Sequence, residues 1–150
     1  VIENIVSKYK NENENIIFHK RSDELSQDNT STIDVLTDIV VNMDIKHDII
    51  LLQPTNPIRS VDTMMNMKNI FEKNNDSIVT IKKQIIKYGD LENNIYTPLN
   101  YHFGERSQNL NNVFSENGNI YIFKNDTVRN NKMINKHMYG YSYKYVYVYN

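Results

Sequence analysis

The sequence predicts an α/β domain in which helices cover both faces of a mostly parallel sheet. The first observation is a run of four apolar residues, Ile49 to Leu52, with no polar residue between them. Strands of parallel sheets have this pattern because both of their faces are buried. The second observation is that helical and strand patterns alternate along the chain, which favours α/β layers. We therefore expect a three-layer α/β/α architecture.

Length and composition limit the classes of protein. The chain has 150 residues, a formal net charge of -1 and no cysteine. This length predicts a single domain with one core. The charge gives no electrostatic reason to expect nucleic acid or a membrane as partner, and no apolar run approaches the roughly 18 residues that cross a bilayer. Without cysteine, disulfides, thiolate metal sites and a cysteine nucleophile are excluded, and we expect a cytoplasmic protein.

Apolar spacing predicts the first elements in order. Residues 2–10 carry apolar side chains at helical intervals, which predicts an amphipathic helix that packs on the sheet. Residues 16–18 are expected to form a short strand that ends at a basic trio. A helix is predicted over 32–43, because Ser31 and Asp34 resemble a capping box ahead of an apolar face.

The central apolar strand is followed by a polar connection. Pro54 and Pro57 cannot donate backbone hydrogen bonds, so the chain must leave the sheet after Gln53. Ser60 is the expected N-cap of a helix over 61–74. The polar residues between them are expected at the carboxyl end of the strand, where open α/β sheets bind ligands. The same pattern also fits an ordinary connection between a strand and a helix.

The second half of the chain is expected to contain further strands. Asn117 and Gly118 form a turn dipeptide just before one of them. The tyrosines near the C-terminus alternate with other residues, which predicts a strand with one aromatic face, typical of a core or a dimer surface more than of base stacking. The predicted elements are strands over 77–81, 95–99, 120–123 and 141–149, and a short helix over 126–131.

Three segments carry longer motifs. They are RSDELSQDNTST at 21–32, LLQPTNPIR at 51–59 and FSENGNIYI at 114–122. In the same order and at similar spacing, they resemble RPxELAxDxxxS, LLQPTSPLR and (F/Y)xxNGAIYI of the acylneuraminate cytidylyltransferases, which make CMP-sialic acid and related CMP-sugar acids. The resemblance covers nearly all of the chain and implies a Rossmann-like nucleotidyltransferase fold.

The resemblance implies nucleotidyl transfer as the activity. The anomeric hydroxyl of a nine-carbon 2-keto sugar acid of the N-acylneuraminate type attacks the α-phosphate of CTP, and pyrophosphate leaves. Such catalysis needs positioning and charge neutralisation rather than a protein nucleophile, and Mg²⁺ is the implied cofactor. The related Kdo enzymes carry a GDEP-like turn in place of QPTNP, so sialic, legionaminic or pseudaminic acid is favoured as acceptor.

The resemblance also implies roles for individual residues. Gln53 and Arg106 are the expected catalytic residues, although the RQxLP motif of the family is shifted by one position at Arg106. Asn119 stands where the family has alanine. The implied nucleotide contacts are Arg21 and Thr32, and the implied substrate contacts are Gln53, Thr55, Lys87, Arg106, Asn117 and Tyr121.

Some family features do not occur in this sequence. Family members begin with a Gly-rich loop that holds the triphosphate and carry an Asp-x-Asp metal pair beyond the last predicted strand. We therefore expect residues 1–150 to be a single, partial cytidylyltransferase domain that has no metal ligand of its own and binds CTP poorly. Residues 88–112 match the insertion through which family subunits pair, which implies a homodimer.

One alternative belongs to another functional class. The chain could be a divergent or truncated, non-catalytic sugar-binding or scaffold domain of the same fold, and the shifted Arg106 and the Asn119 replacement fit such divergence. An Asp-x-Asp pair directly after Asn150 in a longer sequence would favour the enzyme.

Overall fold

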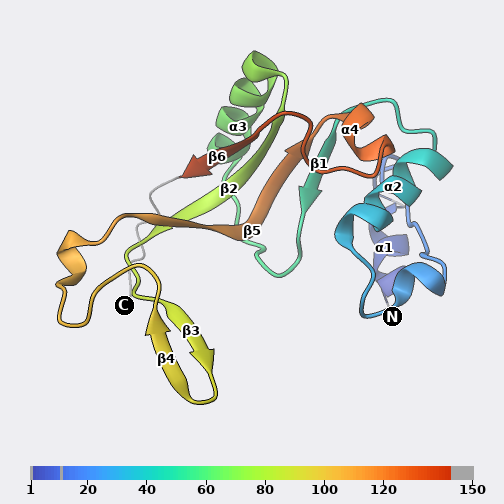
Figure 1. The fold of residues 1–150 in the computed structure, drawn as a ribbon. Coiled ribbons are helices and arrows are strands. Elements are labelled where there is room, and N and C mark those ends of the chain that lie inside the picture. The colour runs from blue at the N-terminus through green and yellow to red at the C-terminus, as the bar shows by residue number, and fades with distance from the viewer. Residues whose placement is uncertain (1, 11, 143–150) are drawn as a thin grey trace. The chain divides into compact units, whose positions relative to one another are not determined.

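The computed structural model describes residues 2–10 and 12–142, which form two compact units. The first unit contains the residues up to His47 together with Asn125–Met133. The second unit contains Asp48–Lys124 and the described residues from Ile134 onward. Figure 1 traces these segments by colour along the chain.

A four-stranded sheet forms the centre of the second unit, in the order β1-β5-β2-β6. Strand β5 pairs antiparallel with both β1 and β2, whereas β2 pairs parallel with β6. Three strands therefore run in one direction, and β5 alone runs in the other between two of them. The strands are β1 (Ile49–Leu52), β2 (Ser77–Gln84), β5 (Val113–Phe123) and β6 (Met138–Ser142).

The α/β class is confirmed, but the prediction of a mostly parallel sheet is wrong for the described strands, because two of their three pairings are antiparallel. An apolar run indicates burial and does not encode strand direction. Strand β1 lies at an edge of the sheet rather than between two neighbours, and its Ile50 and Leu52 are 52% and 44% exposed. The three-layer, Rossmann-like arrangement stays a prediction.

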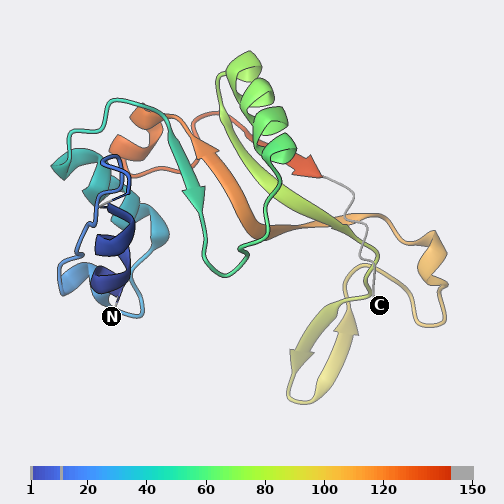
Figure 2. The ribbon, with the colours of Figure 1, turned by 180° about the vertical axis from the view of Figure 1, so that it is seen from behind.

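Helix α3, Val61–Asn74, covers one face of this sheet (Figures 1 and 2). Ser60 caps the helix as predicted, since its side-chain oxygen accepts the backbone N–H of Thr63 at 3.1 Å. Asn75 ends it in the left-handed conformation, with φ 53°. Every fourth residue of α3 faces the sheet, and the core consists of Met67, Phe71, Ile78, Ile120 and Ile122.

The first unit is helical. Helix α1 (Ile2–Lys10) forms where it was predicted, and none of its described residues is buried within the first unit. Its expected packing on the sheet stays a prediction. Helix α2 (Thr32–Asn42) begins at the predicted cap, where Ser31 accepts the backbone N–H of Asp34 at 3.2 Å. The strand predicted over 16–18 does not form. A short η1 helix spans Glu24–Ser26.

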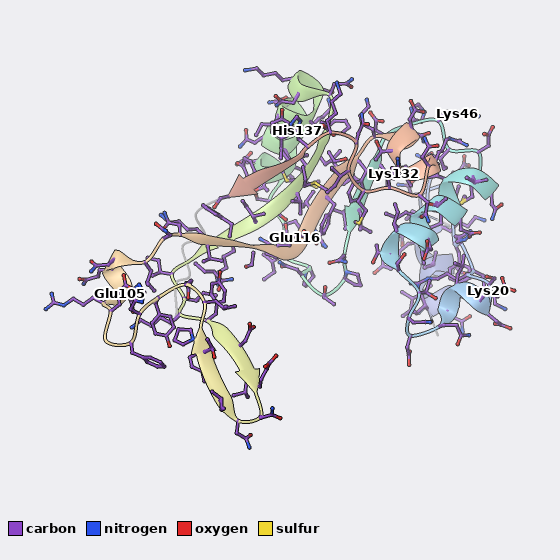
Figure 3. The ribbon with its side chains drawn as sticks, in the orientation of Figure 1. Lys20, Lys46, Glu105, Glu116, Lys132 and His137 are labelled. Atoms are coloured by element: carbon purple, nitrogen blue, oxygen red, sulfur yellow. The ribbon has the colours of Figure 1, made fainter. Side chains whose placement is uncertain are left out.

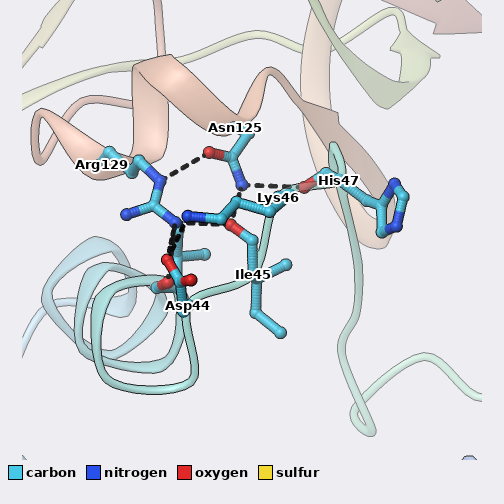
Figure 4. A network of polar contacts seen from close by, with 7 residues as sticks. Asp44, Ile45, Lys46, His47, Asn125 and Arg129 are labelled. Carbon is cyan, nitrogen blue, oxygen red and sulfur yellow. Dashed lines mark hydrogen bonds and ion pairs between the residues drawn. The ribbon is translucent and has the colours of Figure 1, made fainter.

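Helix α4 (Asn125–Arg129) is tied to the end of α2 by side-chain hydrogen bonds (Figure 4). Asn125 donates to the backbone carbonyls of Ile45 and His47 at 2.8 and 2.9 Å. Arg129 donates to the same Ile45 carbonyl at 2.6 Å and to Asn125 at 2.8 Å. These bonds satisfy carbonyls that follow the helix and have no helical partner.

A separate two-stranded hairpin consists of β3 (Gly89–Glu92) and β4 (Ile95–Pro98), which confirms the strand predicted from residue 95. Its two turn residues, Asn93 and Asn94, have φ of 48° and 65°, as a two-residue turn of type I′ requires. A short helix, η2, spans Ser107–Asn109.

Two outcomes concern the whole chain. Strand β6 contains the start of the aromatic strand predicted over 141–149, whereas residues 143–150 lie outside the described residues. Among the helices of residues 2–10 and 12–142, none has the length and apolar character that crossing a bilayer requires.

Candidate functional site

Two of the three motif segments lie against each other in the second unit. The first is the connection after β1, residues 53–59, which we call the turn. The second is residues 117–120 of β5, which we call the bulge, because the register between β2 and β5 shifts there and β5 carries extra residues. Next to active sites, β-bulges often change the direction in which a side chain points, so the side chains of this bulge are candidate functional groups.

Hydrogen bonds lock the turn to the bulge in both directions. The Asn56 side chain donates to the backbone carbonyl of Asn117 at 3.1 Å. The Asn119 side chain donates to the carbonyl of Ile58 at 2.8 Å, and Arg59 Nε donates to the carbonyl of Asn119 at 3.0 Å. Each bond joins segments about sixty residues apart in the sequence, so the two segments form one rigid substructure.

Arg59 also makes hydrogen bonds within the turn. Its guanidinium donates to the backbone carbonyl of Gln53 and, at 3.4 Å, to that of Pro57. A planar guanidinium can serve several carbonyls at once because its five N–H donors lie in a fixed fork. The first residue of the turn, Gln53, is thereby fixed relative to β5.

Gly118 is the point where the predicted site residues meet. It has φ of 66°, a conformation that favours glycine. A Cβ atom at this position would lie 2.7 Å from Gln53 Oε1 and 4.0 Å from Thr55 Oγ1. The side chains of Gln53 and Thr55 therefore lie beside Gly118, the residue that follows Asn117, so the structure brings two predicted contact residues close to the bulge.

Asn119 is the third residue of the bulge. Its side chain is completely buried, and its nitrogen holds the turn rather than lining an open surface. Its Oδ1 atom has no hydrogen-bond partner among the described residues. An amide therefore replaces the family's alanine as part of the scaffold under the turn.

Tyr121 is buried within the sheet beside Phe123, with ring centroids 5.9 Å apart. Its hydroxyl donates to Glu116 Oε2 at 3.0 Å, and Glu116 is labelled in Figure 3. Burial, together with the neighbouring carboxylate, raises the pKa of Tyr121 to about 12, so the hydroxyl is a proton donor at neutral pH. Its predicted contact with the substrate stays a prediction.

Lys87 and Arg106 belong to a different region, near the hairpin. Lys87 donates to the backbone carbonyl of Glu105, and its ammonium lies 5.0 Å from the ring centroid of Tyr101. Arg106 is exposed at the start of η2. Figure 3 shows Glu105 far along the unit from Glu116, so the structure does not bring these two basic residues to the turn.

Arg21 and Thr32 belong to the first unit, and both are exposed. Thr32 is the first residue of α2, whose N-terminal N–H groups could face an anion. However, one of these groups already bonds Ser31, and the nearby Asp34 carries a carboxylate whose pKa is lowered by hydrogen bonds from Ser31 and Asn131. The nucleotide contacts implied for Arg21 and Thr32 stay predictions.

The described residues do not offer a metal site. Within residues 2–10 and 12–142, no three histidine, aspartate or glutamate side chains gather closely enough to hold an ion. Hard cations such as Mg²⁺ need several oxygen ligands, so these residues do not fit the implied cofactor by themselves.

Comparison with known proteins finds a curated relative of this chain. The chain is 28% identical over 121 residues to a CMP-N,N'-diacetyllegionaminic acid synthase of Legionella pneumophila subsp. pneumophila. The match covers 75% of this chain and 52% of that protein, so the chain spans about half the length of its curated relative. No family model matches the chain. The similarity supports a cytidylyltransferase-like relationship at a coarse level.

Three residues that contribute to this site were not among the predicted contacts. Arg59 and Asn119 bond backbone carbonyls of the opposite segment, and Thr80 of β2 donates to Asn117 Oδ1 at 2.6 Å. Arg59 is the last residue of the QPTNPIR motif. This position indicated that Arg59 is important but did not indicate which contacts it makes. Thr80 gave no signal, because it belongs to a buried strand outside the three motifs.

Proposed function

We propose that the protein containing this chain transfers CMP from CTP to a nine-carbon 2-keto sugar acid of the N-acylneuraminate type. In this reaction the anomeric hydroxyl oxygen bonds to the α-phosphorus, and the bond from that phosphorus to the bridging oxygen breaks. Pyrophosphate leaves, and the hydroxyl proton is released. The product is a CMP-sugar acid.

One observation supports this proposal most strongly. Two segments that resemble the family's motifs are about sixty residues apart, yet they are interlocked by Asn56, Arg59 and Asn119. If the sequence similarity were coincidental, there would be no reason for both segments to belong to one substructure in which Gln53 lies beside Gly118. The relative's printed name, a CMP-sugar acid synthase, agrees with the same reaction class.

The chemistry of the turn suits an acceptor rich in hydroxyl and carboxylate groups. Gln53 and Asn117 carry amides that can both donate and accept hydrogen bonds, and Thr55 adds a hydroxyl. In our proposal these groups hold the sugar acid, while Arg21 and Thr32 contact the nucleotide. Arginine suits that role because its planar fork can donate two bonds to a phosphate or a base carbonyl.

Further parts of the proposal extend beyond the described residues. When bound, Mg²⁺ would neutralise phosphate charge, and its ligands would come from residues other than those described here. We further propose a homodimer paired through residues 88–112 and a cytoplasmic location.

The direct test is an assay of pyrophosphate release by the full-length protein. The protein is supplied with CTP, Mg²⁺ and, in parallel, sialic, legionaminic or pseudaminic acid. We expect release with at least one acceptor, and a CMP-sugar acid should be identified by mass spectrometry. Absence of both products with all three acceptors would contradict the proposed reaction.

Replacing Gln53 with alanine tests the acceptor contact. We expect the substitution to lower kcat/KM for the sugar acid. The loss of transition-state stabilisation should be about 1 to 3 kcal/mol, the range for a lost hydrogen bond that leaves its partner unsatisfied. The matched control is Asn69→Ala, which removes an exposed amide from α3 and should leave the rate unchanged. An unaffected rate in the Gln53 variant would remove this residue from the site.

A second candidate function is a non-catalytic sugar-binding domain. The observation that favours it is the separation of Arg106 from the turn, because the family's motif arginine would otherwise contact the substrate. Calorimetry with the sugar acid alone distinguishes the two candidates. Binding without any pyrophosphate release in the presence of CTP and Mg²⁺ would favour this second function.

A further inference from the structure

Two asparagines, Asn56 of the turn and Asn119 of the bulge, each bond the backbone of the opposite segment. The Asn56 side chain donates to the carbonyl of Asn117 at 3.1 Å. The Asn119 side chain donates to the carbonyl of Ile58 at 2.8 Å and to that of Asn56 itself at 3.4 Å. Carbonyls only accept hydrogen bonds, so the amide nitrogens are the atoms that face them. We call Asn56 and Asn119 the asparagine pair.

The asparagine pair holds the part of the turn that carries two predicted acceptor contacts. The backbone N–H of Asn56 donates to the carbonyl of Gln53 at 3.3 Å. This bond closes a four-residue β-turn with Pro54 in the second position, where proline is favoured, and Thr55 in the third. A displacement of Asn56 would therefore move the backbone of Gln53 and Thr55 with it.

The side chains of Gln53 and Thr55 are available to a ligand. Neither side chain has a hydrogen-bond partner among the described residues. Gln53 Oε1 and Thr55 Oγ1 lie 2.7 and 4.0 Å from the position that a Cβ atom would take at Gly118. No bond of their own fixes these two groups beside the bulge, so their position depends on how the turn is held.

The role of Asn119 is geometric more than stabilising. Its side chain is completely buried, and its Oδ1 atom has no hydrogen-bond partner among the described residues. A buried oxygen without a partner costs free energy, which offsets part of what the two N–H bonds contribute. The advantage of this amide over an apolar side chain is therefore mainly the position at which it holds the turn.

The asparagine pair also joins two departures from the motifs. Asn56 stands where LLQPTSPLR has serine, and Asn119 stands where NGAIYI has alanine. Independent divergence gives no reason for these two replacements to bond each other's segments across about sixty residues of sequence. Their contact indicates that the two replacements depend on each other.

We propose that the asparagine pair positions Gln53 and Thr55 for the sugar acid, with Asn56 and Asn119 acting as one unit. The inference rests on the proposed function and adds two positioning residues to it. A turn that is held from both sides presents its polar side chains in one geometry, so less conformational entropy is lost when the acceptor binds. The residues proposed to contact the nucleotide belong to the first unit, so the asparagine pair does not hold them.

The first experiment compares steady-state kinetics of the full-length wild-type protein with Asn56→Ala, Asn119→Ala and the double variant. We expect each single substitution to raise KM for the sugar acid about tenfold and to leave KM for CTP unchanged. The double variant should show no more than the larger single effect, because a pair that has lost one member no longer holds the turn. A rise of about a hundredfold, the product of two independent effects, would overturn the proposal.

The matched control is Asn74→Ala at the opposite end of α3 from the turn. Asn74 also donates its side-chain amide to a backbone carbonyl, that of Ile70 at 2.8 Å, and its removal should change neither KM value. If the buried Asn119→Ala variant fails to fold, Asn56→Ala decides alone, because Asn56 is only half-buried. An unchanged KM for the sugar acid in Asn56→Ala, or equal rises of both KM values, would overturn the proposal.

A readout without turnover separates this inference from the proposed reaction. The side-chain amide signals of Gln53 in ¹⁵N-labelled full-length protein are assigned by their loss in Gln53→Ala. We expect them to shift in Asn56→Ala and Asn119→Ala and to remain unchanged in Asn74→Ala. If the wild-type protein releases no pyrophosphate with any acceptor, the proposed function fails, and shifted signals still support the positioning of Gln53 by the asparagine pair. Unchanged signals in both variants would overturn that positioning.

Discussion

Gly118 combines two constraints that can be separated by mutation. Its φ of 66° is unfavourable for any residue with a Cβ atom, and that atom would also meet the amide oxygen of Gln53 at 2.7 Å. We expect Gly118→Ala to destabilise the fold by about 1 to 2 kcal/mol through the backbone alone. It should also displace Gln53 and raise KM for the sugar acid, as measured by urea unfolding and steady-state kinetics.

Gly104 provides the control for this prediction. Its φ is 86°, and nothing lies within 4 Å of the position a Cβ atom would take. Gly104→Ala should therefore lose comparable stability without changing KM. If both variants had the same kinetics, Gln53 beside Gly118 would have no part in acceptor binding.

At the scale of single residues, the resemblance marked Gln53, Thr55 and Asn117 as contacts but did not indicate how they are held. The side chains of Gln53 and Thr55 lie beside Gly118, the residue that follows Asn117 in the chain. The residues that fix them, Arg59 and Thr80, act mainly on backbone carbonyls and amide oxygens of distant segments. Such contacts depend on strand register, which no local pattern in this sequence specifies.

At the scale of elements, Asp76 joins the end of α3 to the start of β6. Its carboxylate is buried and accepts the backbone N–H groups of Ser77 at 2.9 Å and His137 at 2.8 Å. Burial raises the pKa of this carboxyl, but hydrogen bonds from the backbone of residues 137, 77 and 136 outweigh it, so the pKa lies below its ordinary 3.8. The charged form is therefore the one that stabilises the fold.

The sign of the pH dependence follows from this lowered pKa. Asp76 contributes stability above the unfolded-state pKa near 3.8, and the contribution is lost as the pH falls through the lower folded-state value. We expect Asp76→Asn to lose about 1 to 3 kcal/mol at neutral pH, because its NH₂ group faces a buried N–H donor. The difference from wild type, measured by urea unfolding, should shrink below about pH 4.

Hydrogen exchange locates the effect of Asp76. The amides of Met138–Ser142 should exchange faster in Asp76→Asn, since β6 loses its anchor. His137→Ala is the control, because the exposed imidazole is 3.7 Å from the carboxylate whereas the backbone N–H makes the bond. Equal effects of both variants would assign the anchoring to the imidazole instead.

The sequence predicted most elements and their caps, but not the way they assemble. Capping residues and apolar spacing are local, so α2 and α3 begin where Ser31 and Ser60 predicted. Strand direction is not local. Strands β1, β2 and β6 do share one direction, but the reversed β5 lies between two of them and makes most pairings antiparallel.

At the scale of the whole molecule, exposed apolar side chains gather on the hairpin and the loop after it. We call this group the hairpin surface. Leu91, which pairs with Tyr96, and Ile95, which pairs with Glu92, lie on opposite faces of the hairpin. The most exposed members are Leu91 at 69%, Ile95 at 68%, Leu99 at 57% and Phe103 at 75% exposed. It lies within residues 88–112, the region for which the family resemblance implied subunit pairing, and this supports the proposed homodimer.

Charge introduced into the hairpin surface tests the dimer. A glutamate at the centre of an apolar interface would be buried without a partner, so Ile95→Glu should convert a dimer to a monomer. The mass is measured by light scattering during size-exclusion chromatography of the full-length protein. Ile17→Glu is the control, because Ile17 is 61% exposed in the first unit and should not affect pairing. A wild-type monomer, or a dimer that survives Ile95→Glu, would contradict pairing through this surface.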